Sequence, residues 1–164
     1  MASQFIHITL PDGTRKQVPA GCTVREALTP EGGRLDAKVL AAKINGEPMD
    51  LSRPLEQDAT IEPLTFESAE GREVYRHSST HIMAQAVKEV FPTAQLTIGP
   101  ALDDGFYYDF AFDRPFTPED LEKIEARAIE IMKRGLTVTR SELSKQDAIK
   151  FFQERGEGYK VELI

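Results

Sequence analysis

Residues 4–18 read QFIHITLPDGTRKQV, and this stretch decides the fold of the first part of the chain. Ile6 and Ile8 alternate with residues that face the other way, which is the two-residue period of a half-buried strand. The turn at residues 11–14 contains the proline and glycine that tight turns favour. The stretch therefore predicts an opening hairpin, with His7 on its outer face.

The segment after this hairpin predicts one short helix and further strands. Thr23 and Glu26 have the spacing of a capping box, in which each side chain satisfies a free backbone N–H group at the start of a helix. The dipeptide Asn45-Gly46 favours a tight hairpin turn. Further strands are expected at residues 40–44, 48–51 and 59–63. The order of strand, strand, helix and strands within residues 1–64 indicates a β-grasp fold, which is a mixed sheet crossed by one helix.

A polar stretch at residues 65–71 lacks periodicity and separates this part from the rest of the chain. We therefore expect two domains, at residues 1–64 and 65–164, and an α+β fold class for the whole. The second domain is predicted to open with a long helix at residues 70–91. Pro92 ends that helix because proline cannot continue it.

Helix signals recur in the second domain. Thr117 and Pro118 are placed as N-cap and first helical residue, and Gly135 is placed as the terminator of the same helix. Ser144 predicts the cap of a third helix. Strands are expected at residues 95–98, 106–113, 136–141 and 159–164. The even-numbered aromatic residues of the 106–113 strand are expected to share one face.

The charge distribution argues against a basic nucleic-acid-binding module. The net charge is −7, with −2 in residues 1–64 (7 basic minus 9 acidic) and −5 in residues 65–164 (13 basic minus 18 acidic). Contacts to phosphates need clustered Lys or Arg, so binding of RNA must rest on a local patch or on other parts of a larger protein. The sequence has neither a long apolar run nor the start of a signal peptide. We therefore expect a cytoplasmic protein that does not bind a membrane.

His77 and His81 are the first candidates for chemistry. They lie four residues apart in the predicted long helix, so their side chains lie about one turn apart on the same side. A neutral imidazole accepts a proton or binds zinc, and the pair could act on a bound water, a substrate hydroxyl or a metal. By helical periodicity the pair shares an arc with Ala84 and Lys88, away from the main apolar stripe. The alternative is a pair of surface or structural histidines, which the spacing alone favours.

The same pair does not complete a metal site. A catalytic zinc has about three protein ligands, and the remaining histidine, His7, belongs to the first domain. The single cysteine, Cys22, also belongs to the first domain and cannot form a disulfide within the chain. We expect no cofactor in this chain, with His77 and His81 as partial metal ligands at most.

Four blocks of sequence then point to a known family. They are residues 76–88 (RHSSTHIMAQAVK), 98–100 (IGP), 105–109 (GFYYD) and 155–161 (RGEGYKV). In this order they resemble the second amino-terminal domain of bacterial threonyl-tRNA synthetases. Residues 1–64 resemble the TGS domain that precedes it in that family, which agrees with the β-grasp interpretation. The resemblance covers nearly the whole chain.

The resemblance implies an editing domain that hydrolyses Ser-tRNA(Thr) after serine has been attached by mistake. It implies that His77, His81 and Lys160 are catalytic residues and that Tyr108 is a substrate-binding wall. Threonine exceeds serine by one methyl group, and a contact of that size discriminates by only about 1–3 kcal/mol. A second, hydrolytic site that rejects threonine by its size therefore has a physical reason.

The resemblance also implies what the parent protein needs. The parent, a threonine–tRNA ligase, uses ATP and Mg, binds tRNA(Thr), has a zinc ion in its aminoacylation domain and forms a homodimer through domains outside this chain. The family's editing site is completed by a Cys-x-x-x-His element that this sequence lacks. We therefore expect a fragment that is inactive alone. The alternatives are a stand-alone trans-editing hydrolase and a non-catalytic TGS-type module that binds RNA or regulates another activity.

Overall fold

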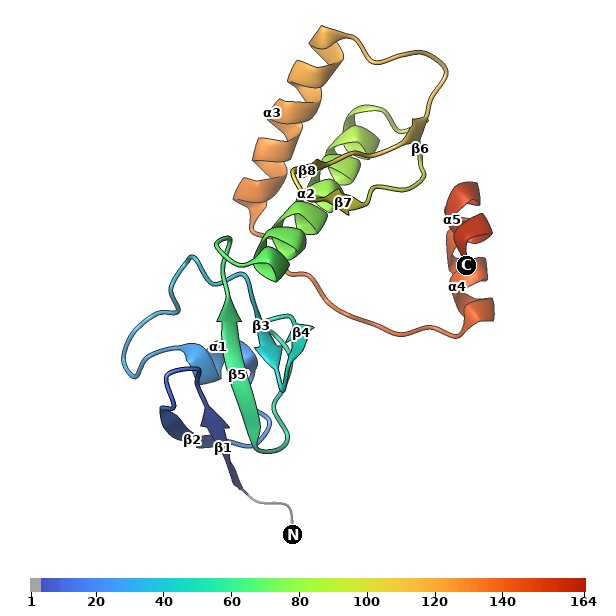
Figure 1. Cartoon of the computed structure of the whole chain (residues 1–164). Coiled ribbons are helices and arrows are strands. Elements are labelled where there is room, and N and C mark those ends of the chain that lie inside the picture. Colours follow the sequence, from blue (N-terminus) through green and yellow to red (C-terminus); the bar gives the residue numbers. More distant parts are fainter. Residues whose placement is uncertain (1–3) are drawn as a thin grey trace. The chain divides into compact units, whose positions relative to one another are not determined.

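The computed structural model describes residues 4–164. Contacts divide the chain into two compact units, Met1–Tyr75 and Arg76–Ile164 (Figure 1). This division falls inside a helix, whereas the sequence predicted a boundary between residues 64 and 65, so the domain limits stay a prediction. No helix in the described part of the chain is both long and apolar enough to cross a membrane.

The first unit contains a five-stranded sheet and one short helix. Its elements are β1 (Phe5–Thr9), β2 (Arg15–Pro19), α1 (Val24–Leu28), β3 (Ala41–Ile44), β4 (Glu47–Met49) and β5 (Ala59–Leu64). The strand order is β2-β1-β5-β3-β4. β1 and β5 run parallel, and the other neighbouring strands run antiparallel. This mixed sheet with one helix confirms the predicted β-grasp fold.

Local sequence signals set the ends of these elements. The hydroxyl of Thr23 accepts the backbone N–H of Glu26 at 3.2 Å, and the carboxylate of Glu26 accepts the backbone N–H of Thr23 at 2.7 Å. This confirms the predicted capping box at the start of α1. Asn45 and Gly46 have positive φ values of 51° and 90°, which the tight turn between β3 and β4 requires.

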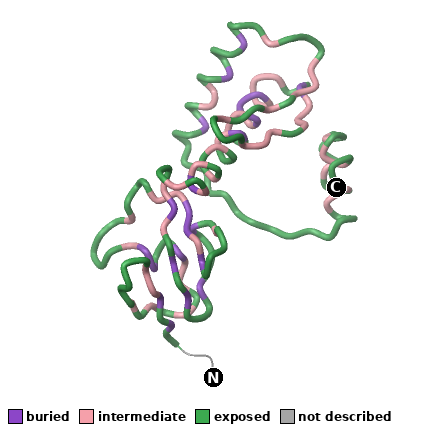
Figure 2. Tube along the Cα trace, viewed as in Figure 1, coloured by how far each residue is buried: buried purple, intermediate pink, exposed green. Residues whose placement is uncertain are grey.

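The core of the first unit lies between α1 and one face of the sheet. Ile8 from β1, Val24 from α1 and Ile61 from β5 are at most 1% exposed. Buried residues recur along the strands of this unit (Figure 2). His7 lies on the opposite face of β1, and its Nδ1 atom is 3.9 Å from the Asp58 carboxylate. The predicted alternation of this strand is thus confirmed. Each buried aliphatic side chain contributes about 1.5–3 kcal/mol to the stability of the unit.

The second unit combines helices with pairs of very short strands. Its elements are α2 (Ala69–Val90), which begins in the first unit, β6 (Gln95–Leu96), β7 (Ala101–Leu102), β8 (Gly105–Phe106), β9 (Phe110–Ala111), α3 (Pro118–Arg134), α4 (Lys145–Glu154) and α5 (Gly158–Leu163). β6 pairs with β9, and β7 pairs with β8. α2 and α3 share a core, whose buried residues are Ala86, Val87, Ala94, Ile124 and Ile131.

The predicted helix signals of this unit are confirmed at α3 and α4. Thr117 caps α3 by accepting the backbone N–H of Asp120, and Gly135 ends the helix in the left-handed conformation with φ at 56°. Ser144 caps α4 by accepting the backbone N–H of Asp147. Each signal acts within one helical turn, so it is readable from the sequence alone.

Two predicted strands of the second unit are wrong. Residues 136–141 are exposed and form no strand. Residues 159–164 lie largely in α5, where the carbonyl of Glu157 accepts the backbone N–H groups of Lys160 and Val161 at 3.0 and 3.3 Å. Apolar and β-branched residues favour a strand when they pack beside a partner strand. Neither segment has such a partner in the described part of the chain.

The strand predicted at residues 106–113 is interrupted. β8 ends at Phe106, and β9 begins at Phe110. Phe110 and Phe112 pack against the core of the second unit, whereas Phe106 is 37% exposed. The expectation that the even-numbered aromatic residues share one face is therefore wrong for Phe106, because the regular strand does not continue between the two short strands.

Candidate functional site

The imidazoles of His77 and His81 face each other on α2. Their Nε2 atoms lie 3.1 Å apart, and their ring centroids lie 4.7 Å apart with an angle of 88° between the ring planes. At this distance one neutral ring donates its N–H and the other accepts it. The two histidines therefore act as one coupled group, and their spacing of one helical turn had predicted that they converge.

Two neighbouring side chains fix this part of α2. Thr80 is fully buried, and its hydroxyl donates to the carbonyl of His77 at 2.7 Å. Arg76 donates through Nη1 to the carbonyl of Leu102 at 3.0 Å and also to the carbonyl of Asp103. These contacts tie the β7–β8 hairpin to the turn of α2 that carries His77.

Lys160 reaches the site from α5. Its Nζ atom donates to the carbonyl of Thr97 at 2.8 Å and lies 3.5 Å from the hydroxyl oxygen of Tyr108. The same ammonium lies 5.9 Å from the centroid of the Tyr108 ring, within the range of cation–π attraction. The sequence placed Lys160 on a strand, and the structure places it on a helix in contact with the predicted wall residue.

The environment of His81 favours its neutral form. Burial lowers the pKa of His81 below its ordinary value of 6.5, and repulsion from His77, when that ring is protonated, and from the Lys160 ammonium lowers it further. Burial disfavours an imidazolium because it removes water, and nearby positive charges repel it. His81 is therefore neutral near pH 7, and a neutral imidazole retains a nitrogen that can accept a proton.

Tyr108 forms a packed wall beside Lys160. Its ring stacks on that of Phe110, with centroids 4.7 Å apart and planes 25° apart. Gly99 leaves room for the ring, because a Cβ atom at Gly99 would lie 2.1 Å from a ring carbon of Tyr108. The ring is therefore held between Phe110 and the backbone of Gly99.

The structure places the four predicted site residues in the second unit. His77 contacts His81, Lys160 contacts Tyr108, and the charge of Lys160 acts on His81. His7 lies in the first unit. Among the described residues, no group of three His, Cys, Asp or Glu side chains could hold a metal ion. The four side chains together offer an imidazole pair, an anchored ammonium and an aromatic hydroxyl.

The face of α2 that carries the histidines is more covered than periodicity predicted. Ala84, expected on the arc of the histidines and away from the apolar stripe, is 4% exposed. The helix meets α3 through the shared core, and it meets the start of α5 through Lys88 and Glu157. A helix with neighbours on more than one side does not show a single apolar stripe.

Three contributors to the site were missed from the sequence. The Nζ atom of Lys88 lies 2.9 Å from Oε1 of Glu157 and 3.0 Å from the carbonyl oxygen of Ala94. Thr97 contributes a backbone carbonyl, which every residue type possesses and no pattern reveals. Periodicity placed Lys88 on the arc of the histidines, but its pairing with Glu157 could not be predicted because the two residues are distant in the sequence, although both lie within the blocks that resemble the known family.

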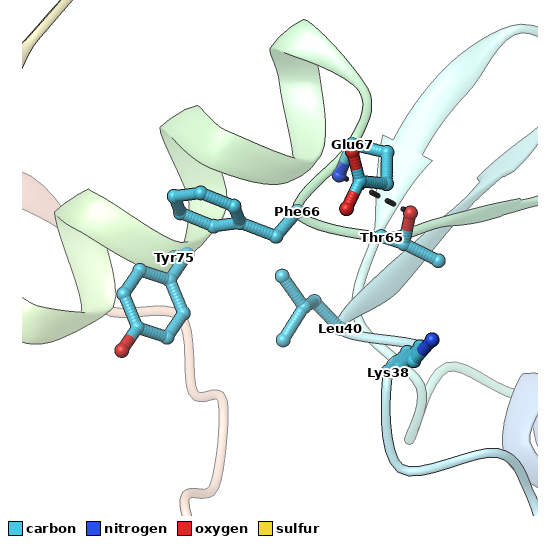
Figure 3. Close-up of a pocket in the computed structure, with 6 residues that line it drawn as sticks. All are labelled: Lys38, Leu40, Thr65, Phe66, Glu67 and Tyr75. Atoms are coloured by element: carbon cyan, nitrogen blue, oxygen red, sulfur yellow. Dashed lines mark hydrogen bonds between the residues drawn. The ribbon is translucent and has the colours of Figure 1, made fainter.

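The first unit offers a pocket without comparable chemistry. This pocket has a volume of about 370 Å³ and is lined by Lys38, Leu40, Thr65, Phe66, Glu67 and Tyr75 (Figure 3). The rings of Phe66 and Tyr75 meet edge to face, with centroids 5.2 Å apart. The lining contains no histidine, the side chain that ordinarily accepts a proton near neutral pH. This pocket therefore lacks the imidazole chemistry of the His77–His81 pair.

Comparisons with known proteins find relatives along nearly the whole chain. A family model described as the TGS domain matches residues 6–65. Threonine–tRNA ligase of Symbiobacterium thermophilum is 53% identical over 99% of this chain, and that of Citrifermentans bemidjiense is 50% identical over 97%. Threonine–tRNA ligase of Acetivibrio thermocellus is 48% identical over 98% of this chain. Each match covers 25% of the relative, so the chain spans about a quarter of the length of the curated relatives it matches.

Proposed function

This chain belongs to the threonine–tRNA ligase family and contains a TGS domain, and from that relationship we propose that its second domain serves the hydrolysis of Ser-tRNA(Thr). In this proposal the parent protein attaches threonine to tRNA(Thr) and removes serine attached by mistake. The proposed domains are residues 1–64, the TGS domain, and residues 65–164, the first part of the editing domain. One observation carries the proposal: Lys160 lies beside Tyr108 and its charge acts on His81, although these residues come from separate segments.

Water activation is the proposed role of the histidine pair. Hydrolysis of the ester between serine and tRNA requires a group that takes a proton from water. We assign that role to His77, and we assign the orientation of water or substrate to His81. The 3.1 Å contact between their Nε2 atoms supports this assignment, because one ring holds the other in a defined orientation. The lowered pKa of His81 also supports its proposed role, because a neutral His81 ring can accept a hydrogen bond from water or substrate.

Lys160 supplies the positive charge in this proposal. Attack of water on the ester carbonyl produces an oxyanion, which a fixed positive charge in a partly dry site stabilises. The hydrogen bond to the carbonyl of Thr97 holds the ammonium in place before substrate binds. A charge that is already oriented needs no reorganisation during the reaction, so it favours the transition state.

Tyr108 is the proposed wall of the serine pocket. Its ring is packed between Phe110 and Gly99, so it has little room to move when a larger ligand binds. A rigid wall suits a site that must reject one additional methyl group. A pocket that adapts to the additional methyl group would distinguish serine from threonine by only about 1–3 kcal/mol.

The wider proposal concerns the parent protein. Ligation of threonine to tRNA uses ATP and Mg, and we propose that these, the zinc ion and the homodimer contacts belong to regions outside this chain. tRNA(Thr) is the proposed partner, and the cytoplasm is the proposed location. The net charge of −5 in residues 65–164 indicates that most phosphate contacts come from those other regions.

Hydrolysis by the parent protein in a single turnover tests the proposal. His77→Ala is expected to slow deacylation of Ser-tRNA(Thr) by about 10²–10⁴, the usual contribution of a positioned acid or base. Threonylation of tRNA(Thr) should be unchanged. His7→Ala removes an exposed histidine of the first unit and is the matched control. A folded His77→Ala protein that deacylates at the parent's rate would mean that the histidines are structural and would favour a non-catalytic, RNA-binding role.

A further inference from the structure

We propose that Lys88 and Glu157 are positioning residues that hold Lys160 in the candidate site. Their ion pair joins the second half of α2 to the start of α5, the helix that carries Lys160. The catalytic meaning of the pair rests on the proposed function. The positioning itself is a property of the folded chain and is testable without substrate.

Lys88 projects from the histidine side of α2. It lies two turns of the helix beyond His81, so the two side chains leave the same face. Its ammonium lies 2.9 Å from Oε1 of Glu157 and donates to the carbonyl of Ala94 at 3.0 Å. The bond to Ala94 limits where the ammonium can lie, so Glu157 meets a charge in a defined place.

Glu157 connects this charge to Lys160. Its carbonyl accepts the backbone N–H of Lys160 at 3.0 Å, and its own backbone N–H donates to the carbonyl of Phe152 at 3.0 Å. The side chain of Glu157 is 12% exposed, and its Oε2 atom has no hydrogen-bond donor within residues 4–164. Loss of Lys88 would leave this carboxylate poorly solvated and without its cation, which strongly disfavours the present arrangement.

The place of α5 depends on few contacts of this kind. The helix has six residues, none of them buried, and no side-chain hydrogen bond caps its start. Isolated helices of that length are unstable in water. The connecting residues 136–144 are exposed and have no regular structure, so they do not fix the position of α4 and α5. The ion pair and the hydrogen bond from Lys160 to Thr97 therefore anchor α5 at two separate points.

Titration of His81 in the 164-residue chain, monitored by NMR, reports whether Lys160 is in place. His81 feels burial and the positive charges of His77 and Lys160, and all three lower its pKa. Release of Lys160 should therefore raise the pKa of His81 toward 6.5. Lys160→Met gives the reference value for complete loss of that charge.

Two variants of the pair separate positioning from direct effects of charge. Lys88→Met removes a positive charge and Glu157→Gln removes a negative charge, so their direct effects on a nearby imidazolium have opposite signs. Positioning predicts instead that both variants raise the pKa of His81 toward the Lys160→Met value. Both should also speed amide exchange of Lys160 by roughly tenfold or more, because a charged hydrogen bond no longer holds the start of α5.

The parent protein provides a catalytic readout of the same pair. Glu157→Gln is expected to lower kcat for Ser-tRNA(Thr) hydrolysis toward that of Lys160→Met, with KM little changed, because Lys160 acts on the oxyanion. If Lys160→Met hydrolyses Ser-tRNA(Thr) at the parent's rate, the proposed role of Lys160 fails. The positioning inference is then still decided by the titration of His81.

Matched controls complete the experiment. Lys88→Arg keeps the charge and should restore the wild-type titration of His81. Lys150→Met breaks the exposed Lys150–Glu154 pair of α4, whose atoms are 4.0 Å apart, and should change neither readout. Unchanged resonances of the α3 core residues show that the unit remains folded. Shifts of opposite sign in Lys88→Met and Glu157→Gln, or no shift in either, would overturn the inference.

Discussion

The two units of this chain differ in how far apart in the sequence the residues that determine their structure lie. In the first unit, the strands have three to six residues, and strong local signals mark the turns and the helix start. In the second unit, every strand has two residues, and the candidate site joins side chains from α2, from the segment at residues 97–108 and from α5. The difference teaches that local signals are enough to specify the first unit, whereas the candidate site depends on contacts between distant segments of the second unit.

The largest expected effect tests whether the first unit has a core of its own. Ile8 is fully buried in that core, so Ile8→Ala should lower the free energy of unfolding of the first unit by about 2–5 kcal/mol. Amide hydrogen exchange reports the two units separately, and α3 should keep its protection. Leu121→Ala, at a position that is 57% exposed, is the control and should change stability by at most about 0.5 kcal/mol. Equal loss of protection in both units would show that the first unit does not have a core of its own.

The next effect concerns the close packing of the candidate site. Gly99→Ala places a methyl group against the ring of Tyr108 and should destabilise the second unit by about 1–3 kcal/mol, the usual cost of overpacking. The ring resonances of Tyr108 should shift at the same time. Gly105→Ala is the matched control, because nothing lies within 4 Å of its Cβ position. Equal, small effects of the two substitutions would show that the Tyr108 wall is loosely packed.

Loss of a helix cap should lower the stability of either unit by a similar amount. Thr23 caps α1 and Thr117 caps α3, each through a reciprocal capping box. Replacement of either threonine by alanine should lower the stability of its own unit by about 1 kcal/mol, because one backbone N–H loses its partner. Denaturant titration monitored by amide exchange measures each cost. A cost in only one unit would show that the second unit does not rely on local signals in the same way.

The smallest expected effect is a loss of stability of the second unit at low pH. Arg134, Gln85 and Arg127 donate to the carboxylate of Glu89 and lower its pKa from 4.5 to about 2. A carboxylate with a lowered pKa stabilises the fold above its ordinary pKa, and that contribution is lost as the pH falls from about 4.5 to about 2. The expected loss of stability is modest because solvent screens the partly exposed ion pairs of Glu89 with Arg127 and Arg134. After correction for the intrinsic pH dependence of exchange, the protection of the α3 amides should fall over this range, and Glu89→Gln should reduce that fall, while Asp120, whose pKa is also lowered, keeps its own contribution. An unchanged profile in the variant would contradict the assignment.

Much of the fold was readable because its signals are local. The capping box at Thr23, the turn at Asn45 and Gly46 and the cap at Thr117 each act within a few residues, and tertiary contacts do not alter them. The segment at residues 159–164 was misread because its apolar alternation matches a strand, while no partner strand pairs with it in the described part of the chain.

The candidate site was readable only in part for the same reason. The spacing of His77 and His81 predicted that they converge, because the helix fixes their separation. The contact between Lys160 and Tyr108 could not be predicted from spacing, because it depends on how α5 packs against the rest of the second unit. Similarity to a known family named both residues, and physical reasoning from the sequence did not.

The most direct measurement of the central claim is the set of NOEs between side chains of the 164-residue chain. The claim is that the second unit assembles two contacts of the candidate site, the one between His77 and His81 on α2 and the one between Lys160 of α5 and Tyr108. It predicts NOEs between the ring protons of His77 and His81, and between the methylene protons of Lys160 and the ring protons of Tyr108. Absence of the Lys160–Tyr108 NOEs, with narrow resonances showing that α4 and α5 move independently, would contradict the claim.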